Sequence, residues 1–346
     1  MVRVGIVGAS GYTGAELIRL LRRHPEARVC LLAARTHAGK SLPEVFPQFW
    51  GLEDERLIAA SPEEFVREVD VLFTALPAGE AIPYARAALE AGKKLIDLGA
   101  DFRFREAGVY ERWYGISHGA PELLREAVYG LPELYRDQIK TARLVANPGC
   151  YPTAVLLALV PPLKAGQILP EGIVVDAKSG VSGAGRQPKI ETLYAEVNEN
   201  VQAYNVAVHR HTPEMEQILR DKLGKEVRLT FVPHLVPQTR GILATIYAPL
   251  APGVTTEDLL ATYREYYREE PFVKVLPAGV YPRTKSVWGS NLVQLGAVAD
   301  GRTGRAVLLA ALDNLVKGAA GQAVQNFNLS YGFPETMGLE DSGIYP

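Results

Sequence analysis

Cys150 is the residue of this chain with the clearest capacity for covalent chemistry. It lies in the segment 147–153, Asn-Pro-Gly-Cys-Tyr-Pro-Thr, directly before an apolar run that begins at Ala154. Proline is tolerated in the first turn of a helix and not in its interior, so Pro152 predicts that the cysteine lies at a turn-to-helix junction. Unpaired N–H groups and the helix dipole favour the nucleophilic thiolate there. Cys30, in contrast, lies inside an apolar strand-like run and is expected to be an inert core residue.

A glycine-rich turn follows the first apolar run of the chain. Gly8, Gly11 and Gly14 are spaced Gly-x-x-Gly-x-x-Gly between a strand-like segment and a helical pattern. Such glycines let the backbone approach a pyrophosphate, and the helix start offers N–H groups and a favourable dipole. We therefore expect a dinucleotide here, and the alternative is a tight turn that only packs the helix on the strand. The expected contacts from this turn are Gly8, Ser10, Gly11, Tyr12 and Thr13.

The end of the second expected strand distinguishes between the nicotinamide cofactors. NAD sites place an acidic residue there for the ribose hydroxyls, whereas this chain has Ala34, Arg35, Thr36 and His37. A guanidinium and a hydroxyl suit a 2′-phosphate. We predict NADP(H), with Arg35 and Thr36 as contacts, and the alternative is a solvated basic loop.

A thiolate beside NADPH implies a definite class of reaction. The thiolate attacks an activated acyl group to form a thioester, which hydride from the cofactor reduces to an aldehyde. An acyl phosphate is a natural donor because phosphate leaves readily. Inorganic phosphate would then be the product, or the co-substrate in the reverse direction.

Two regions of different periodicity must position these residues. Before residue 100, apolar runs at 2–8, 29–34, 70–75 and 94–98 alternate with helical patterns, which indicates a parallel sheet covered on both faces. Residues 110–136 are predicted as a long loop with short helices. After residue 148, alternating runs at 172–177, 227–232 and 241–248 favour a mixed or antiparallel sheet with helices on one face. The Ala-rich segment 304–327 is predicted to be helical.

The expected fold is therefore α/β in two domains. Residues 1–147 and 313–346 would form a Rossmann-like NADP-binding domain to which the C-terminal helix returns. Residues 148–312 would form an α+β mixed-sheet domain for catalysis and oligomerisation. A length of 346 residues suits two domains.

Composition excludes several other classes of protein. With 47% hydrophobic and 22% charged residues the chain is globular, and a net charge of −2 provides no basic field for nucleic acid or anionic membrane. We expect no secretory leader, and no apolar run reaches the roughly 18 residues that a membrane span needs. Two cysteines are too few for a disulfide framework or a structural zinc site. These features predict a cytoplasmic protein without a metal.

Five segments, in chain order, resemble the N-acetyl-gamma-glutamyl-phosphate reductase family, which is related to aspartate-semialdehyde dehydrogenase. They are residues 8–14, 147–153, 179–186, 209–214 and 313–322, and they span nearly the whole chain. The resemblance implies a Rossmann-like cofactor domain, a mixed-sheet catalytic domain and assembly as a homodimer or homotetramer. It also implies reversible NADPH-dependent reduction of N-acetyl-glutamyl phosphate to its semialdehyde in arginine biosynthesis, through a thioester on Cys150.

The resemblance further implies a histidine acid/base from the segment His209-Arg210-His211. Thr212, as an N-cap, and Pro213 predict a helix start directly after it. If the preceding residues are extended, His209 and His211 point the same way. A histidine titrates near neutral pH and can protonate the developing aldehyde oxygen. The sequence does not rank the two histidines, and both are candidates.

Arginines are the candidate binders of the anionic substrate, since the forked guanidinium matches phosphate and carboxylate. The resemblance implies that Arg103 contacts the phosphate. Arg186, in a Gly/Ser-rich loop, and Arg210 are substrate contacts or surface ion-pair residues, and Asn147 joins the expected substrate set. For the cofactor, the expected residues beyond the glycine turn are Leu76, Pro77, Ser179, Ser182, Gly183 and Asn314.

Two alternative functions follow from the same residues. Relatives in carrier-protein lysine biosynthesis reduce an aminoadipyl phosphate attached to a small acidic protein, but they tend to depart from the Asn-Pro-Gly-Cys-Tyr-Pro pattern that is intact here. An NADP-binding regulator that has lost catalysis would be expected to have lost its nucleophile or acid/base residue. Both types of residue are present in this sequence.

Overall fold

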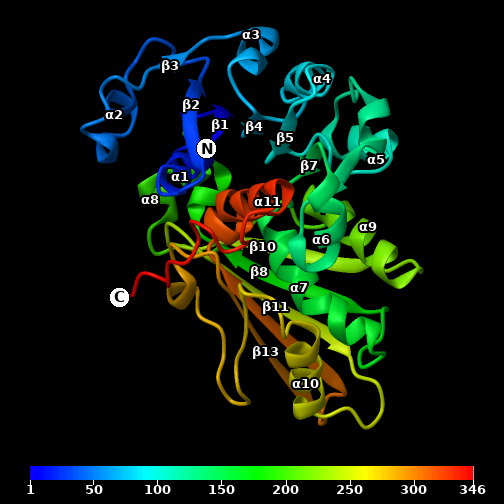
Figure 1. Ribbon diagram of the computed structural model, residues 1–346. Coiled ribbons are helices and arrows are strands. Elements are labelled where there is room, and N and C mark those ends of the chain that lie inside the picture. The colour runs from blue at the N-terminus through cyan, green and yellow to red at the C-terminus, as the bar shows by residue number, and fades with distance from the viewer. Residues whose placement is uncertain (346) are drawn as a thin grey trace. The chain divides into compact units, whose positions relative to one another are not determined.

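The computed structural model, which describes residues 1–345, divides into two compact units. The first comprises Met1–Pro148 and Ala319–Glu340, and the second comprises Gly149–Gly318 and the chain from Asp341 onward. The sequence analysis expected the changes of domain at 147/148 and 312/313. The structure instead keeps 313–318 and the end of the chain with the second unit, and only the segment around helix α11 (Gly321–Tyr331) returns to the first (Figure 1).

A seven-stranded sheet in the order β3-β2-β1-β4-β5-β7-β6 forms the centre of the first unit, and every neighbouring pair is parallel. The central strands are fully buried where they are most apolar, which is the expected pattern for a parallel sheet covered on both faces. The expected parallel sheet is therefore confirmed. Its strands are β1 (Val2–Val7), β2 (Ala27–Ala33), β3 (Leu57–Ile58), β4 (Val71–Thr74), β5 (Lys94–Asp97), β6 (Ala127–Tyr129) and β7 (Leu144–Ala146).

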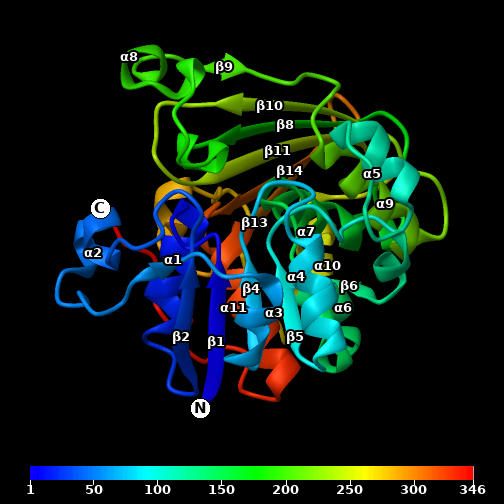
Figure 2. The ribbon, with the colours of Figure 1, turned by 90° about the horizontal axis from the view of Figure 1, so that it is seen from above.

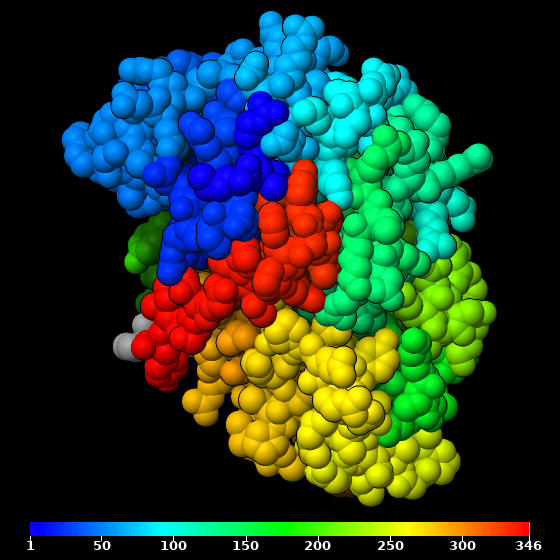
Figure 3. All heavy atoms as spheres, viewed as in Figure 1, coloured from blue at the N-terminus to red at the C-terminus, as the bar shows by residue number. Residues whose placement is uncertain are grey.

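Helices complete the first unit. Helix α11 packs against the helices near both ends of the unit's main segment, α1 and α6, and in the space-filling view its red residues border the blue N-terminal ones (Figure 3). The helices are α1 (Tyr12–Leu21), α2 (Leu42–Val45), α3 (Pro62–Arg67), α4 (Ile82–Glu90), α5 (Ala107–Tyr114), α6 (Pro132–Thr141) and α11.

The segment 110–136 is more ordered than the long loop that the sequence predicted. It contains the end of α5, a 3-10 turn at Pro121–Arg125, strand β6 and the start of α6. Strand β6 is only three residues long and is defined by its pairing with β7. A strand this short has too few residues to show a periodicity of its own, so only the tertiary pairing reveals it.

The second unit is built on a mixed seven-stranded sheet in the order β12-β13-β14-β11-β8-β10-β9. Residues of β8 and β11 alternate between buried and half-buried, because helices α7 (Cys150–Lys164), α9 (His211–Leu223) and α10 (Thr256–Tyr266) cover one face. Strand β9 is the edge strand next to β10, and helix α8 (Tyr194–Val197) lies beside β9 at this edge of the sheet (Figure 2). The strands are β8 (Ile173–Ser179), β9 (Gln202–Ala203), β10 (Leu229–Leu235), β11 (Ile242–Pro249), β12 (Val273–Val275), β13 (Val293–Asp300) and β14 (Arg305–Leu312).

Two expectations about local structure are wrong. The first half of segment 304–327 is strand β14, paired between β11 and β13, and it is followed by a π-helix at Val316–Ala320 before α11. Pairing in the middle of a sheet overrides the helix propensity of alanine. Cys30 is exposed and not a core residue, because it shares the open face of β2 with the exposed Arg28.

Among the described residues, no helix is long and apolar enough to cross a lipid bilayer.

Candidate active site

The three glycines of the first turn have different neighbours. Gly8 has a φ of +88°, and a Cβ there would lie 2.3 Å from the carbonyl oxygen of Ala75. A Cβ on Gly14 would lie 2.5 Å from the carbonyl oxygen of Gly8, so both of these glycines are required for close packing. Gly11, the N-cap of α1, has only one atom near its hypothetical Cβ, the Gly8 oxygen at 3.5 Å. Gly11 is therefore the glycine that leaves room for a ligand.

The start of α1 has the features of an anion site. No side chain caps it, and its first turn contains no acidic residue. Tyr12 is exposed, while Ser10 and Thr13 are half-buried. The N–H groups and the dipole of this helix end are thus available to an anionic ligand.

Arg35 and Thr36 lie just beyond the end of β2. The Arg35 side chain is 81% exposed and its Nη1 is 2.9 Å from Glu80 Oε2 in an ion pair, while Thr36 Oγ1 lies 2.9 Å from His37 Nδ1. Exposed ion pairs are weak, so Arg35 can exchange Glu80 for a phosphate at little cost. Leu76 and Pro77, just past the end of β4, are half-buried and exposed respectively.

Arg103 is buried and oriented by backbone oxygens. Its Nε donates to the carbonyl of Asn147 at 2.8 Å and its Nη2 donates to that of Leu98 at 2.9 Å. The Asn147 side chain is fully buried: its Nδ2 donates to the Ala319 carbonyl at 3.1 Å and its Oδ1 accepts from Asn326 at 3.0 Å. These contacts make Asn147 a structural link to the C-terminal segment, which argues against the direct substrate contact expected for its amide.

Cys150 is the first residue of α7, as the sequence predicted. Gly149 is the N-cap, without a capping side chain, and the first turn contains no acidic residue. The Gly149 N–H donates to Oε1 of the buried Glu214 at 2.8 Å. A Cβ on Gly318 would lie 2.8 Å from the Cβ of Cys150, so the π-helix packs closely on the cysteine. The thiol thus lies at a positive helix end in an enclosed setting of the second unit.

His211 lies against the backbone beside Cys150. A Cβ on Gly149 would be 2.5 Å from His211 Nε2 and 2.8 Å from its two neighbouring ring carbons. The segment before it is a turn and not the extended chain that was considered, and α9 begins at His211 itself, with Arg210 and not Thr212 as its N-cap. The turn still brings the rings together, with His209 and His211 centroids 4.8 Å apart.

His209 occupies an aromatic environment. Its ring makes edge contacts with Tyr151, Tyr204 and Phe231 at centroid distances of 5.7, 5.5 and 5.2 Å. Burial, helped by the positive charge of Arg210, lowers the pKa of His209 to about 4. His209 is therefore neutral at physiological pH. Its Nδ1 accepts a hydrogen bond from the backbone N–H of His211 at 3.1 Å.

Four predicted cofactor residues converge in the second unit. Asn314 Oδ1 accepts from the Gly241 N–H at 2.7 Å, and its Nδ2 donates to Ser182 Oγ at 2.9 Å. A Cβ on Gly183 would lie 3.2 Å from Ser179 Oγ and 3.7 Å from Asn314 Nδ2. Asn314 lies between the end of β14 at Leu312 and the π-helix, and not within a regular helix as the prediction for 304–327 implied.

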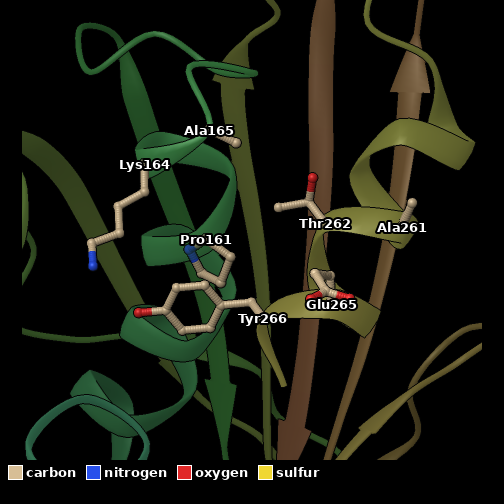
Figure 4. A pocket seen from close by; sticks show the side chains of 7 residues that line it. All are labelled: Pro161, Lys164, Ala165, Ala261, Thr262, Glu265 and Tyr266. Atoms are coloured by element: carbon tan, nitrogen blue, oxygen red, sulfur yellow. The ribbon is translucent and has the colours of Figure 1, made fainter. Parts of the chain in front are cut away.

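Arg186 and Arg210 are both exposed. A hollow lined by apolar parts of α7 and α10 lies at the far end of α7, roughly 16 Å along the helix from Cys150 (Figure 4). Its lining is Pro161, Lys164, Ala165, Ala261, Thr262, Glu265 and Tyr266. It is therefore separate from the residues that could perform chemistry.

Glu214 and Tyr151 are site residues that the sequence analysis did not select. The Tyr151 hydroxyl accepts from that of Tyr204 at 3.1 Å, and its ring lies edge-on to both histidines. Both residues belong to the segments that carry the family resemblance, 147–153 and 209–214. Their positions were visible in the sequence, but their contacts with Gly149 and the histidines depend on the packing of α9 against α7.

Comparisons with known proteins agree with this arrangement. Residues 3–142 match the NAD binding domain of semialdehyde dehydrogenase, and residues 150–314 match its dimerisation domain. Aspartate semialdehyde dehydrogenase II from Vibrio cholerae shares the fold, with a TM-score of 0.72 and 18% identity over 96% of this chain and 98% of that chain. The enzyme from Candida albicans, solved with NADP, gives a TM-score of 0.71 at 18% identity over 95% and 98%. The expected combination of a nucleotide-binding domain and a mixed-sheet domain is confirmed.

Much greater similarity is found to proteins named N-acetyl-gamma-glutamyl-phosphate reductase. The protein from Moorella thermoacetica is 53% identical over 346 residues, which is all of both chains. That from Symbiobacterium thermophilum is 55% identical over 347 residues, covering 100% of this chain and 99% of the relative. Identity at this level over the full length leaves one assignment: the chain belongs to the N-acetyl-gamma-glutamyl-phosphate reductase family.

Proposed function

We propose that this chain reduces N-acetyl-L-glutamyl 5-phosphate to N-acetyl-L-glutamate 5-semialdehyde with NADPH, releasing inorganic phosphate, as a reversible step of arginine biosynthesis. The observation that supports this most directly is the placement of Cys150 at the start of α7, with the His211 ring packed on the preceding glycine. A nucleophile and an adjacent proton carrier are what acyl transfer to an enzyme thiol requires. Membership of the family supports the identity of the acyl group.

In the proposed mechanism the Cys150 thiolate attacks the acyl carbon, and the carbon–oxygen bond to phosphate breaks with the electron pair leaving on phosphate. NADPH, if held by the glycine turn and by the residues around Asn314, would supply the hydride equivalent that reduction of the thioester requires. His211 donates a proton to the carbonyl oxygen as negative charge develops there. It takes the same proton back as the carbon–sulfur bond breaks, so that the aldehyde forms and the thiolate returns. His211 is preferred over His209 because the low pKa of His209 keeps that ring neutral at pH 7.

The proposed cofactor is NADP(H). Gly8, Ser10, Gly11, Tyr12 and Thr13 would bind the pyrophosphate, with Gly11 allowing close approach. Arg35 and Thr36 would bind the 2′-phosphate, and no acidic residue follows β2 before Lys40. Leu76 and Pro77 would lie along the cofactor, while Ser179, Ser182, Gly183 and Asn314 would hold its nicotinamide end. Arg103 is the proposed contact of the acyl phosphate, with Arg186 and Arg210 as further candidates.

The proposed assembly is a homodimer or homotetramer, since the second unit matches a dimerisation domain. The half-buried face of β8 and β11 supports the sheet as the contact surface. Sedimentation analysis tests the assembly, and a monomer at micromolar concentration would contradict it.

Neither cysteine forms a disulfide, which suits the proposed cytoplasmic location.

The experiment that tests the function is phosphate-dependent reduction of NADP⁺ with N-acetyl-glutamate semialdehyde as substrate. The wild-type protein should turn over, and Cys150→Ser should lose at least about a thousandfold in kcat, because the hydroxyl is far less nucleophilic than a thiolate. The matched control is Cys30→Ser. Full activity of Cys150→Ser would exclude the covalent mechanism, and activity only with a carrier-bound acyl phosphate would favour the carrier-protein alternative. A wild-type protein that binds NADP⁺ without any turnover would favour the inactive regulator.

A further inference from the structure

Asp97 is a buried carboxyl group that the mechanism above does not use. It is the last residue of β5, and its side chain has no exposed surface. Its Oδ1 accepts hydrogen bonds from Thr74 Oγ1 at 2.7 Å and from the Gly99 N–H at 3.0 Å. Its Oδ2 is buried and makes no hydrogen bond with any described residue. Burial, helped by the nearby carboxylate of Asp101, raises the pKa of Asp97 to about 7.

The backbone around Asp97 connects it to Arg103. The carbonyl of Asp97 accepts from the Asn147 N–H at 2.8 Å, and the carbonyl of Asn147 in turn accepts from Arg103 Nε at 2.8 Å. The side chain of Asp97 holds Gly99, next to Leu98, whose carbonyl accepts from Arg103 Nη2. Asp97 therefore anchors both backbone segments that orient the guanidinium.

Other polar groups around this turn are held by their own partners. Asp101 accepts from the backbone N–H groups of Gly79 and Ala81 and from the Tyr110 hydroxyl at 2.8 Å, and its carbonyl lies 2.6 Å from His118 Nε2. The groups that face Asp97 are thus Thr74 from β4, Asp101 and Arg103 from the turn, and Tyr110 and His118 behind Asp101. Asp97 is the member of this set whose carboxyl has an oxygen without a donor, and a buried carboxylate in that situation is unfavourable.

We propose that Asp97 is a positioning residue for phosphate binding. Its side chain is neutral when Arg103 binds the phosphate, and it weakens that binding when it is ionised. In the neutral form it anchors the turn without offsetting the positive charge of Arg103. When it ionises, a second negative charge enters the buried turn beside Asp101 and weakens the attraction of the guanidinium for an anion. The inference rests on the proposed function in that Arg103 is taken as the phosphate contact.

The test compares wild-type protein with Asp97→Asn, which retains an oxygen acceptor for Thr74 and Gly99 but cannot ionise. Binding of inorganic phosphate is measured by calorimetry from pH 6 to 8.5 in the presence of NADP⁺, and the KM for phosphate is measured in parallel. The titration of phosphate itself affects both proteins equally, so the ratio of their dissociation constants isolates Asp97. We expect the two proteins to bind alike at pH 6 and wild type to bind about tenfold more weakly by pH 8.5, the effect of one pKa unit of charge interaction.

Two further variants separate charge from structure. Thr74→Val removes a donor that stabilises the ionised form, so the midpoint of the wild-type loss should move to higher pH. Asp70→Asn removes a surface carboxylate of the same unit that pairs with Arg3, and it should retain the wild-type pH dependence. Parallel pH profiles for wild type and Asp97→Asn, or an unmoved midpoint in Thr74→Val, would overturn the proposal. Calorimetry needs no turnover, so a failure of the proposed function would be seen separately, as an absence of semialdehyde oxidation.

Discussion

Each unit contains a helix whose N-cap is a glycine, and the two helix N-termini have similar local structure. Helix α1 follows β1 with Gly11 as its N-cap, and helix α7 follows β7 with Gly149 as its N-cap. Both glycines have ordinary extended backbone angles, neither helix has a capping side chain, and neither first turn contains an acidic residue. Each start therefore presents the positive end of a helix dipole.

Their surroundings differ. The Gly11 start is bordered by the exposed Tyr12, and only the Gly8 oxygen lies near a hypothetical Cβ of the glycine. The Gly149 start is enclosed by the ring of His211, by Glu214 and by the π-helix at Gly318. The same type of helix N-terminus thus suits binding of an anionic ligand in the first unit and stabilisation of the Cys150 thiolate in the second. The neighbours that tertiary packing supplies decide which of these two roles a helix start can take.

The largest expected difference in kcat is between variants of the two histidines near the N-terminus of α7. We expect His211→Asn to lower kcat at pH 7 by about 10²- to 10⁴-fold, the usual contribution of a general acid/base, because its ring packs beside Cys150. His209→Asn should lower kcat by less than about tenfold, because a histidine with a pKa of about 4 is not an imidazolium at pH 7 and its neutral ring is a very weak acid. Steady-state kinetics of both variants measures this difference, and equal losses would contradict the assignment.

His209 also predicts a pH dependence of stability. Its pKa in the folded protein, about 4, lies below the ordinary value of 6.5, so the unfolded chain binds its proton more readily. The stability associated with neutral His209 is fully present above about pH 6.5 and is lost as the pH falls toward 4. His209→Gln should show a shallower loss of stability over this interval in thermal unfolding, and a slope as steep as that of wild type would contradict the low pKa.

A matched pair of glycine substitutions compares the two helix starts directly. Both backbones accept alanine, and both positions are N-caps, so the loss of capping is similar. Gly149→Ala places a methyl group 2.5 Å from His211 Nε2, and the displaced ring should reduce kcat about a hundredfold. Gly11→Ala should instead raise the KM for NADPH with little change in kcat at saturation. A fall in kcat of the same size for both variants would show that capping, and not the neighbours, decides the effect.

A smaller effect, on cofactor binding, is expected for Arg35 in the first unit. Arg35→Ala should weaken NADPH binding by about ten- to a hundredfold while leaving NADH binding nearly unchanged, since one charge-assisted contact to a phosphate is lost. Arg28→Ala, an exposed arginine earlier on β2, is the control. The ratio of kcat/KM for the two cofactors measures this preference, and an unchanged ratio would place the 2′-phosphate elsewhere.

The smallest effect is expected for the other cysteine. Cys30→Ser should leave kcat, KM and thermal stability within error of wild type, because Cys30 is exposed on β2. The variant should still be inactivated by a thiol-alkylating reagent, since Cys150 remains. Resistance of Cys30→Ser to that reagent would mean that Cys150 is not the reactive thiol.

Much of the fold was predictable where local patterns are long. The predicted apolar runs correspond to strands β1, β2, β4 and β5 of the first unit, and Pro152 marked the first turn of α7 correctly. Strand β14 was missed because its Ala-rich sequence favours a helix until β11 and β13 pair with it on both sides. Strand β6 was missed because three residues give no period, and the exposure of Cys30 depends on which face of β2 is covered.

The sequence by itself determined the chemical inventory: a cysteine at a helix start, a glycine turn for a dinucleotide, an arginine where an NAD site has an acid, and paired histidines. These follow from residue types and short spacings, which act through local backbone geometry. Tertiary structure alone decided that His211 lies on Gly149 while the half-buried His209 lies among aromatic rings, and that the Asn147 amide is hydrogen-bonded to Ala319 and Asn326. It also gave Asp97 a pKa near neutrality. Burial and proximity set proton affinity and contact, and both depend on elements that are distant in the chain.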